Sequence, residues 1–298
     1  MATLRALRAV HWVGDGRHDR VQEELAWLDA ATAAESRPDL CAWRARVDVR
    51  LSRRDDPARA AALCDAALPN AEASGDPLLL GQLLERRLAG AGADADGVAE
   101  RALAALAQTS APAVGAGVVR TPEAERLLEL ERAPEALRVL EPALADTDAA
   151  GATHAMVLGL VGSARVELGQ LDAARDALVL AEALLDRAGE YGVLGVRLGL
   201  ATVDLLAGAP DIAALQGLEA AIRAVFGGPS PYGLEAAAAL VRACAESGEA
   251  ALAGHALSAV EGQLHVPPTR WVERHLDAAA IRLPVALVER LRLARGRG

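Results

Sequence analysis

The stretch that decides the fold is residues 156–189, MVLGLVGSARVELGQLDAARDALVLAEALLDRAG. Its apolar spacing predicts two helices that reverse direction at Gly169, because glycine readily takes the left-handed conformation at a helix end. Small or apolar residues stand where the two helices must touch. They are Gly162, Ala174, Leu178 and Ala181. The stretch therefore predicts a closely packed helical hairpin.

The second helix of this hairpin carries a pattern that recurs along the chain: an anchor residue followed by apolar residues four and seven positions later. The anchors are Val21, Ala60, Ala99, Ala136, Ala174, Ala214 and Ala253, separated by 39, 39, 37, 38, 40 and 39 residues. A turn is expected five positions before each anchor. The turn residues are Gly16, Asp55, Asp94, Gly169 and Gly248, with Gly208 one place off and Glu131 the weakest match. This regularity predicts a repeat array of seven hairpins.

The array is predicted to cover residues 1–264. Its approximate repeats are 2–40, 41–79, 80–116, 117–154, 155–194, 195–233 and 234–264. Residues 265–298 are predicted to form a capping helix pair with a polar outer face and a basic tail, its first helix capped by Thr269. Residues 109–122 fit the repeat least. They predict a long loop before a short helix at 123–131, with a domain boundary in this loop as the alternative.

The composition indicates an all-α protein. Apolar residues make up 52% of the chain and aromatic residues only 2%, so Ala and Leu must supply most of the burial. The net charge is −10, which disfavours non-specific binding of nucleic acid by the whole surface. No apolar run is long enough for a signal-peptide core or a membrane span, so we expect a cytoplasmic protein. Cys41, Cys64 and Cys244 form no close pair, which fits free thiols in a reducing compartment.

Seven positions of the fifth repeat match the signature of a known family. They are Leu158, Val161, Gly162, Gly169, Ala174, Leu178 and Ala181. On these residues the chain resembles the tetratricopeptide repeat (TPR) family, strongly over residues 155–262 and moderately elsewhere. It departs from the family in its period, about 39 rather than about 34 residues, and in Arg165 and Leu178, where Tyr and Phe are common. Longer variants of this kind are similar to the helical repeat arrays of bacterial signalling and transcription-regulator proteins.

The resemblance implies a right-handed α–α superhelix whose first helices line a concave groove for peptides or helices of partner proteins. Positions on one face of these helices follow from the spacing of 3, 4 and 3 residues. They are Met156, Gly159, Ser163 and Val166 in the fifth repeat and Val196, Gly199, Val203 and Leu206 in the sixth. Seven positions before their anchors, Glu129, Glu167 and Glu246 predict an acidic rim, with Arg242 opposite in sign. We expect such a groove to prefer a peptide with apolar anchors and basic ends.

Three functions remain open at this point. The first is a protein-interaction scaffold with an apolar groove, although the chain's own side chains could also fill that groove. The second is a regulatory module that binds a small peptide or metabolite and changes its winding, suggested by Gly159, Gly162, Gly195 and Gly199. The third is a structural homo-oligomer. Trp12, Trp27, Trp43 and Trp271 fit packing better than contact with a partner.

The residues of common catalytic and metal sites do not occur in the required patterns. The six His show no paired spacing and have no Cys at metal-ligand distance in the sequence. Gly90, Gly92 and Gly97 do not form a phosphate-binding loop, which needs a Lys that this chain lacks. We therefore expect no enzyme activity, no cofactor, no metal and no membrane partner.

Overall fold

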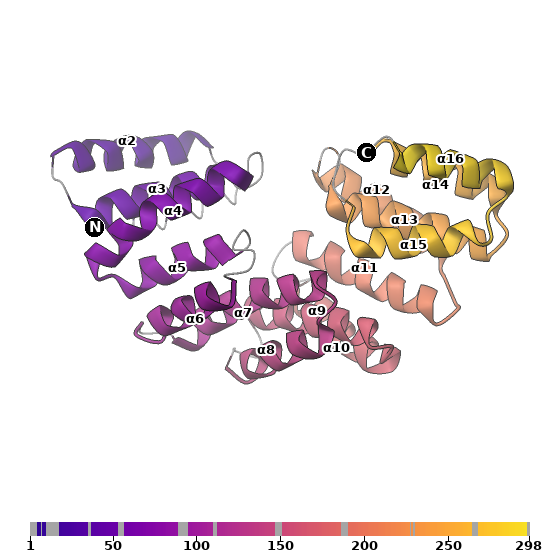
Figure 1. Ribbon diagram of the computed structural model, residues 1–298, viewed down its shortest axis with the longest axis horizontal. Helices are drawn as coiled ribbons and strands as arrows, with labels where there is room; N and C mark the ends of the chain where they lie inside the picture. The colour runs from indigo at the N-terminus through magenta and orange to yellow at the C-terminus, as the bar shows by residue number, and fades with distance from the viewer. Residues whose placement is uncertain are drawn as a thin grey trace. The chain divides into compact units, whose positions relative to one another are not determined.

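The computed structural model describes residues 5–6, 8–9, 18–34, 37–52, 57–88, 95–109, 112–146, 151–185, 190–226, 228, 230–263 and 268–296. These residues form fifteen α-helices, and none of them lies in a β-strand (Figure 1). The helices are α2 (His18–Ala34), α3 (Pro38–Ser52), α4 (Pro57–Ser74), α5 (Pro77–Leu88), α6 (Ala95–Leu106), α7 (Pro112–Glu129), α8 (Ala133–Asp146), α9 (Ala152–Glu167), α10 (Leu171–Leu185), α11 (Glu190–Leu206), α12 (Ile212–Phe226), α13 (Pro231–Glu246), α14 (Ala250–Glu261), α15 (Arg270–Ala280) and α16 (Val285–Arg295). The prediction of an all-α protein is confirmed.

The chain divides into two compact units. Unit 1 comprises Met1–Arg126 with Ala145–Thr147, and unit 2 comprises Leu127–Leu144 with Asp148–Gly298. The division falls within α7, a few residues beyond the segment 109–122 at which the sequence left a boundary open. Unit 2 contains the residues of the predicted groove.

Within each unit the helices pack mostly against their neighbours in the chain. α3 packs on α4, α5 on α6, α9 on α10, and α13 on α14, each as a hairpin. In unit 2 the odd-numbered helices also neighbour one another in order, α9 beside α11, α11 beside α13, and α13 beside α15. This sequential packing is consistent with an array of helical hairpins.

The predicted hairpin turns lie in the left-handed backbone region. Gly169, Gly208 and Gly248 have φ values of +69°, +77° and +78°, which glycine adopts without a steric penalty. Glu131, the weakest match to the repeat, takes the same conformation with φ +59°. The three predicted turns at Gly16, Asp55 and Asp94 lie outside the described residues. The local turn signal therefore located each of the four described turns.

Residues 109–122 contradict the predicted long loop. α7 begins at Pro112 and continues to Glu129, with Pro122 inside the helix. Proline suits the first turn of a helix, where its missing N–H would have no partner in any case. Val119 and Ala124 are fully buried, so packing of the apolar face outweighs the cost of the internal proline. The loop prediction was wrong because it rested on the local composition alone and did not include the burial of Val119 and Ala124.

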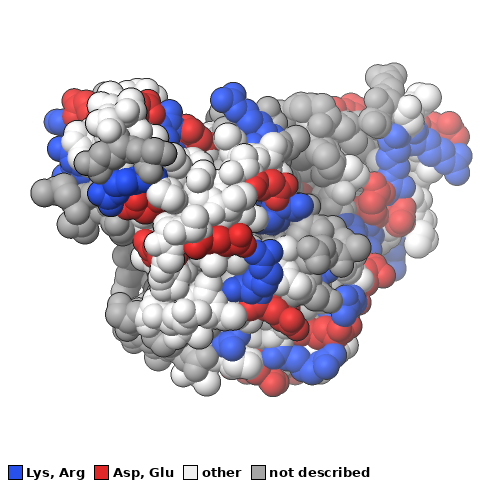
Figure 2. Space-filling model, turned by 60° about the vertical axis from the view of Figure 1, so that its left-hand side comes forward, with Lys and Arg blue, Asp and Glu red and all other residues white. Residues whose placement is uncertain are grey.

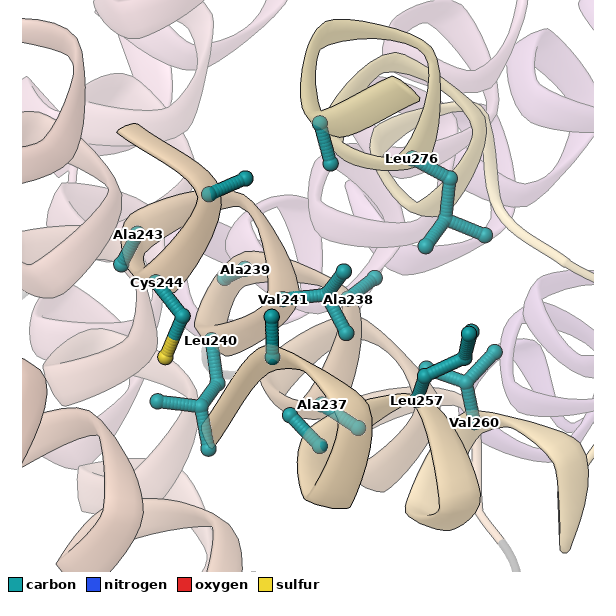
Figure 3. Close-up of a cluster of buried hydrophobic side chains, with 14 of the residues drawn as sticks. Ala237, Ala238, Ala239, Leu240, Val241, Ala243, Cys244, Leu257, Val260 and Leu276 are labelled. Carbon is teal, nitrogen blue, oxygen red and sulfur yellow. The ribbon is translucent and has the colours of Figure 1, made fainter. Parts of the chain in front are cut away.

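Alanine gives α13 its central place in unit 2. Ala236, Ala237, Ala238 and Ala239 are fully buried in succession, which requires neighbours on every side of the helix. Leu257 and Val260 of α14 approach α13 from one side and Leu276 of α15 from another (Figure 3). Small side chains on α13 let these helices approach closely.

The core of unit 1 contains the large aromatic side chain of Trp43, which is fully buried on α3. Trp27 packs partly buried against the same cluster, and the Arg5 guanidinium lies 4.6 Å from the centroid of its ring. Trp12 lies outside the described residues. Both described tryptophans of unit 1 therefore contribute to packing, as the sequence favoured.

The end of the chain adds one more pair of helices to unit 2. α15 packs beside α13 and α16 beside α14, and Thr269 caps α15 as predicted by accepting a hydrogen bond from the Val272 N–H. The exposed side of this pair is less polar than the sequence predicted, because it includes Ile281, Val285 and Leu293. The predicted basic tail is largely neutralised, since Arg290 pairs with Glu261, and Arg295 pairs with Glu273 and Asp277.

The contact between Gly162 and Leu178 yields the first prediction. A Cβ atom on Gly162 would lie 2.5 Å from Cγ of Leu178 and 2.7 Å from its Cδ2. Leu178 is 1% exposed and also abuts Gly199, so it has little room to move. We expect Gly162→Ala to destabilise unit 2 by about 1–3 kcal/mol in urea unfolding.

The matched control is Gly217→Ala on α12. An added Cβ there meets nothing within 4 Å, so the better helix propensity of alanine should stabilise the helix by up to about 1 kcal/mol. If both substitutions stabilised the protein, close packing at Gly162 would be refuted.

Candidate functional site

The apolar positions predicted for the groove lie mostly between helices of unit 2. Val166 of α9 and Val196 and Val203 of α11 are buried in one cluster with Leu178. Leu206 is partly buried and packs against this cluster. The structure thus brings these residues together as a shared core of α9, α10 and α11, which we call the α9–α11 cluster.

Two of the remaining predicted positions, Gly159 and Gly199, allow α9, α10 and α11 to pack closely together. A Cβ atom on Gly159 would lie 3.3 Å from Cγ2 of Val196, and one on Gly199 would lie 3.1 Å from Cδ2 of Leu178. Ser163 donates a hydrogen bond to the carbonyl oxygen of Gly159, 3.2 Å away, within α9. Met156 is the most exposed of the predicted apolar face, at 43%. The glycines that suggested variable winding are therefore explained in part by helix packing.

Helix α15 lies against the same cluster. Trp271 packs on it although it stands more than 60 residues after α11 in the sequence. The guanidinium carbon of Arg274 lies 5.1 Å from the centroid of the Trp271 ring, close enough for a cation–π interaction. An aromatic side chain of the chain itself therefore covers part of the predicted groove surface.

Arginines of α15 bind the carboxylate predicted for the acidic rim. Glu167, at the end of α9, pairs with both Arg270 and Arg274. Its Oε2 lies 3.1 Å from Nη1 of Arg274, 107 residues later in the sequence. Arg274 also places Nη2 3.0 Å from Oε1 of Glu131, in the turn between α7 and α8. The side chain of Glu167 is only 5% exposed, so it forms the centre of this charge cluster.

A further carboxylate lies on α13. Thr269 donates a hydrogen bond to Oε2 of Glu235 across 3.3 Å. Burial raises the pKa of Glu235 to about 7; the hydrogen bond from Thr269 opposes this shift, and the charge of Glu129 adds to it.

Burial and the charge of Arg274 lower the pKa of Arg270, while Glu129 and Glu131 oppose that shift. These electrostatic contacts gather four acidic residues around the start of α15. We call Glu129, Glu131, Glu167 and Glu235 the acidic surface.

The other two predicted rim residues form a pair of their own. Nε of Arg242 lies 2.7 Å from Oε1 of Glu246, one turn further along α13. Arg242 also acts on His275 of α15, which is fully buried. Burial, together with the charge of Arg242, lowers the pKa of His275 to about 3. Neither ring nitrogen of His275 has a hydrogen-bond partner among the described residues.

The sequence identified only part of this site. It named Glu129 and Glu167 as an acidic rim, but it did not assign Glu131, Glu235, Arg270 or Arg274 to a site. The available signal was the spacing Arg-Trp-x-x-Arg directly after Thr269, because residues four apart share one face of a helix. The arrangement holds α15 through ion pairs to Glu167 and through the packing of Trp271 on the α9–α11 cluster.

A separate hollow of about 330 Å³ lies between α11 and α12. Its walls are mainly small and apolar: it is lined by Leu194, Arg197, Leu200, Ala201, Asp204, Asp211, Ala214, Gly217, Leu218 and Ala221. The charged residues at its edge already have partners. Arg197 pairs with Glu182, Asp204 with Arg175, and Asp211 accepts a hydrogen bond from the N–H of Ala214. The hollow can therefore take an apolar group of modest size.

The described residues contain no group of three or more His, Cys, Asp and Glu side chains placed to hold a metal ion. Burial raises the pKa of Cys64 and of Cys244 to about 11, so both thiols are protonated at neutral pH. No helix in the described part of the chain combines the length and the apolar character needed to cross a membrane. On the face shown in Figure 2, acidic and basic side chains of the described residues are interspersed.

Comparison with known proteins adds no family to these observations. No protein-family model matches the sequence, and no curated protein matches it significantly. The function is therefore inferred from the contacts within unit 2.

Proposed function

We propose that this protein is a non-enzymatic interaction scaffold, a right-handed superhelical array of TPR-like hairpins that binds an amphipathic helix of a partner protein. The observation that carries the proposal is the set of contacts that hold α15 in unit 2, which we call the seat of α15. There the α9–α11 cluster receives Trp271, and Glu167 receives Arg270 and Arg274. Recognition of an amphipathic helix needs these two elements, an apolar surface and charges that fix its orientation.

The chemistry of the seat agrees with the ligand expected from the sequence. A groove with an acidic rim favours a helix that combines apolar anchors with basic ends, and α15 has this composition at its first turn. Glu167 is largely withdrawn from water, so its pairing with an arginine is more specific than a pairing on an exposed surface. The proposed setting is cytoplasmic signalling or regulation, with a protein or peptide partner and no nucleic acid.

The hollow between α11 and α12 favours a second candidate function, a sensor module that binds a small peptide or metabolite. Its volume of about 330 Å³ lies at the lower end of the range typical of small-molecule sites. Gly217 faces this hollow and has free space beyond its Cα atom. A Gly217→Phe variant should therefore block a small ligand there while leaving helix binding on the acidic surface unchanged.

Fluorescence anisotropy with labelled peptides tests the scaffold. Three peptides would share one apolar helix face and differ in having basic, neutral or acidic flanking residues. We expect saturable binding of at least one peptide to the full chain, weakened about tenfold or more by Glu167→Arg. Glu182→Arg is the matched control, because Glu182 pairs with Arg197 at a different place on unit 2.

Two results would count against the scaffold. One is the absence of saturable binding of all three peptides up to about 1 mM, the weakest affinity worth assigning to a site. The other is an equal loss of binding in the Glu167→Arg and Glu182→Arg variants, which would mean that the peptides bind by non-specific charge attraction.

A further inference from the structure

We infer that α15 is an exchangeable occupant of the acidic surface, and that a protein helix of the same chemistry takes its place. The partner helix would carry two arginines one turn apart with an aromatic residue directly after the first, as in Arg270, Trp271 and Arg274. This inference rests on the proposed function, because it names the partner class and the regulation of the same surface.

The charges around α15 do not balance. Three carboxylates of the acidic surface, those of Glu129, Glu131 and Glu167, act on the guanidinium groups of Arg270 and Arg274. Glu129 has no ion pair among the described residues. Glu131 is 64% exposed and Arg274 is 42% exposed, so this side of the contact is open to solvent. A partner helix with one further basic side chain would neutralise more of the acidic surface than α15 does. Charge complementarity of this kind selects partners and speeds their association.

His275 makes the docked position of α15 costly. Its imidazole is fully buried, and both ring nitrogens lack hydrogen-bond partners in the described part of the chain. The ring centroid lies 5.8 Å from that of Trp271, and the nearby charge comes from Arg242 of α13. A buried polar group without a partner destabilises the state that buries it. Release of α15 would return this imidazole to water.

The apolar stripe of α15 defines what the partner must replace. Val272, Leu276 and Ala279 are buried in the cluster that α15 shares with α13 and α14. The partner therefore needs apolar residues one, five and eight positions after its aromatic residue, on the face adjoining its arginines. A helix with arginines alone would gain the ion pairs but leave this stripe uncovered.

Covalent linkage of α15 makes it a competitor. A tethered segment has an effective concentration on the order of millimolar, so a free helix binds with reduced apparent affinity while α15 occupies the surface. Weakening the hold of α15 should therefore strengthen the binding of an identical helix added in trans. A merely structural α15 would not show this inverse relation.

The test uses the full chain and a labelled peptide of residues 268–283. We expect the R270Q/R274Q variant, which keeps much of the length of both side chains, to bind this peptide about tenfold more tightly than the wild type does. A peptide with Glu at both arginine positions should not bind. Adding Glu167→Arg to R270Q/R274Q should abolish binding, whereas adding Glu182→Arg should not. R292Q, which removes an exposed arginine that pairs with Glu289 on α16, is the control for loss of charge.

A second measurement does not depend on the folding of the variant. A photo-reactive group at the position of Trp271 in the peptide should cross-link to the α9–α11 cluster of the wild-type chain, and unlabelled peptide should suppress the cross-link. Absence of cross-linking to α9, α10 and α11 at saturating peptide would overturn the inference.

The remaining outcomes separate the inference from the proposed function. If R270Q/R274Q bound a neutral helix as tightly as the basic peptide, the inference would fall while the scaffold remained. If it bound the basic peptide no better than the wild type did, α15 would not be a competitor. If the wild-type chain formed dimers that R270Q/R274Q abolished, the occupant would be a second copy and the partner assigned above would be wrong.

Discussion

Replacing Glu167 with Ala is expected to lower the free energy of unfolding of unit 2 by about 3 kcal/mol. The side chain of Glu167 is 5% exposed and pairs with Arg270 and Arg274. Its removal leaves two guanidinium groups facing one another without the central carboxylate. Arg274 is half-exposed, and water can solvate it after the substitution, which places the effect at the lower end of the range for buried pairs. Urea unfolding followed by circular dichroism would measure the loss.

Glu182→Ala is the matched control, because Glu182 and its partner Arg197 are both substantially exposed. Exposed pairs contribute about 1 kcal/mol or less, so this variant should unfold almost as the wild type does. A double-mutant cycle of Glu167→Ala with Arg270→Ala would give the coupling between the two side chains. Equal effects of Glu167→Ala and Glu182→Ala would show that α15 is not held by this ion pair.

The second large effect is that the stability of the protein should depend on pH in opposite directions when His275 or Glu235 is replaced. The folded state keeps the pKa of His275 near 3, below its ordinary value of 6.5. Folded protein then binds fewer protons than unfolded protein between these two values, so stability is lost as the pH falls below 6.5. The folded state raises the pKa of Glu235 from 4.5 to about 7. Stability is therefore lost as the pH rises from 4.5 to 7.

These two contributions oppose one another in the wild type. Arg242 is the charge that faces His275, while Glu129 and the hydroxyl of Thr269 face Glu235. We expect stability to change little between pH 5 and 6.5, where the two titrations act in opposite directions with similar slopes. The two variants below remove one titration each and should expose the other.

His275→Leu should make the protein more stable as the pH falls from 7 to 5, by about 2–3 kcal/mol, since of these two buried groups Glu235 remains to titrate. Glu235→Gln should make it less stable over the same interval, by about 2 kcal/mol, because of these two buried groups His275 remains to titrate. Thermal unfolding at pH 5, 6 and 7 would measure both slopes. Slopes of the same sign in the two variants would refute the buried position of one or both groups.

The hairpin turns were predictable because their signals are local. Gly169 and Gly248 stand at fixed distances from Ala174 and Ala253, and a glycine at a helix end specifies its own backbone conformation. The close contact of Gly162 with Leu178 follows equally from the spacing within one hairpin. Val166 and Val203, by contrast, were assigned to one helix face, with an open groove and a self-filled one both possible, and the structure buries them between helices. Periodicity shows which residues share a face, but it does not show what covers that face.

The contact between Arg274 and Glu167 could not be predicted in this way. It joins residues 107 positions apart. It depends on how α11 packs on α9, α13 on α11, and α15 on α13. Small differences in the packing of each helix accumulate along that path, and no local pattern specifies them. The sequence analysis expected a ligand with apolar anchors and basic ends, but it did not show that α15 itself carries an aromatic residue between two arginines.

The tie between α15 and α9 also bears on how this chain can change length over evolution. Repeat arrays usually gain or lose units freely, because each unit contacts only its neighbours. In unit 2 a hairpin inserted between α9 and α15 would carry Arg270 and Arg274 away from Glu167, and one deleted there would force them past it. The ion pairs of Arg270 and Arg274 with Glu167 therefore limit how many hairpins can lie between α9 and α15.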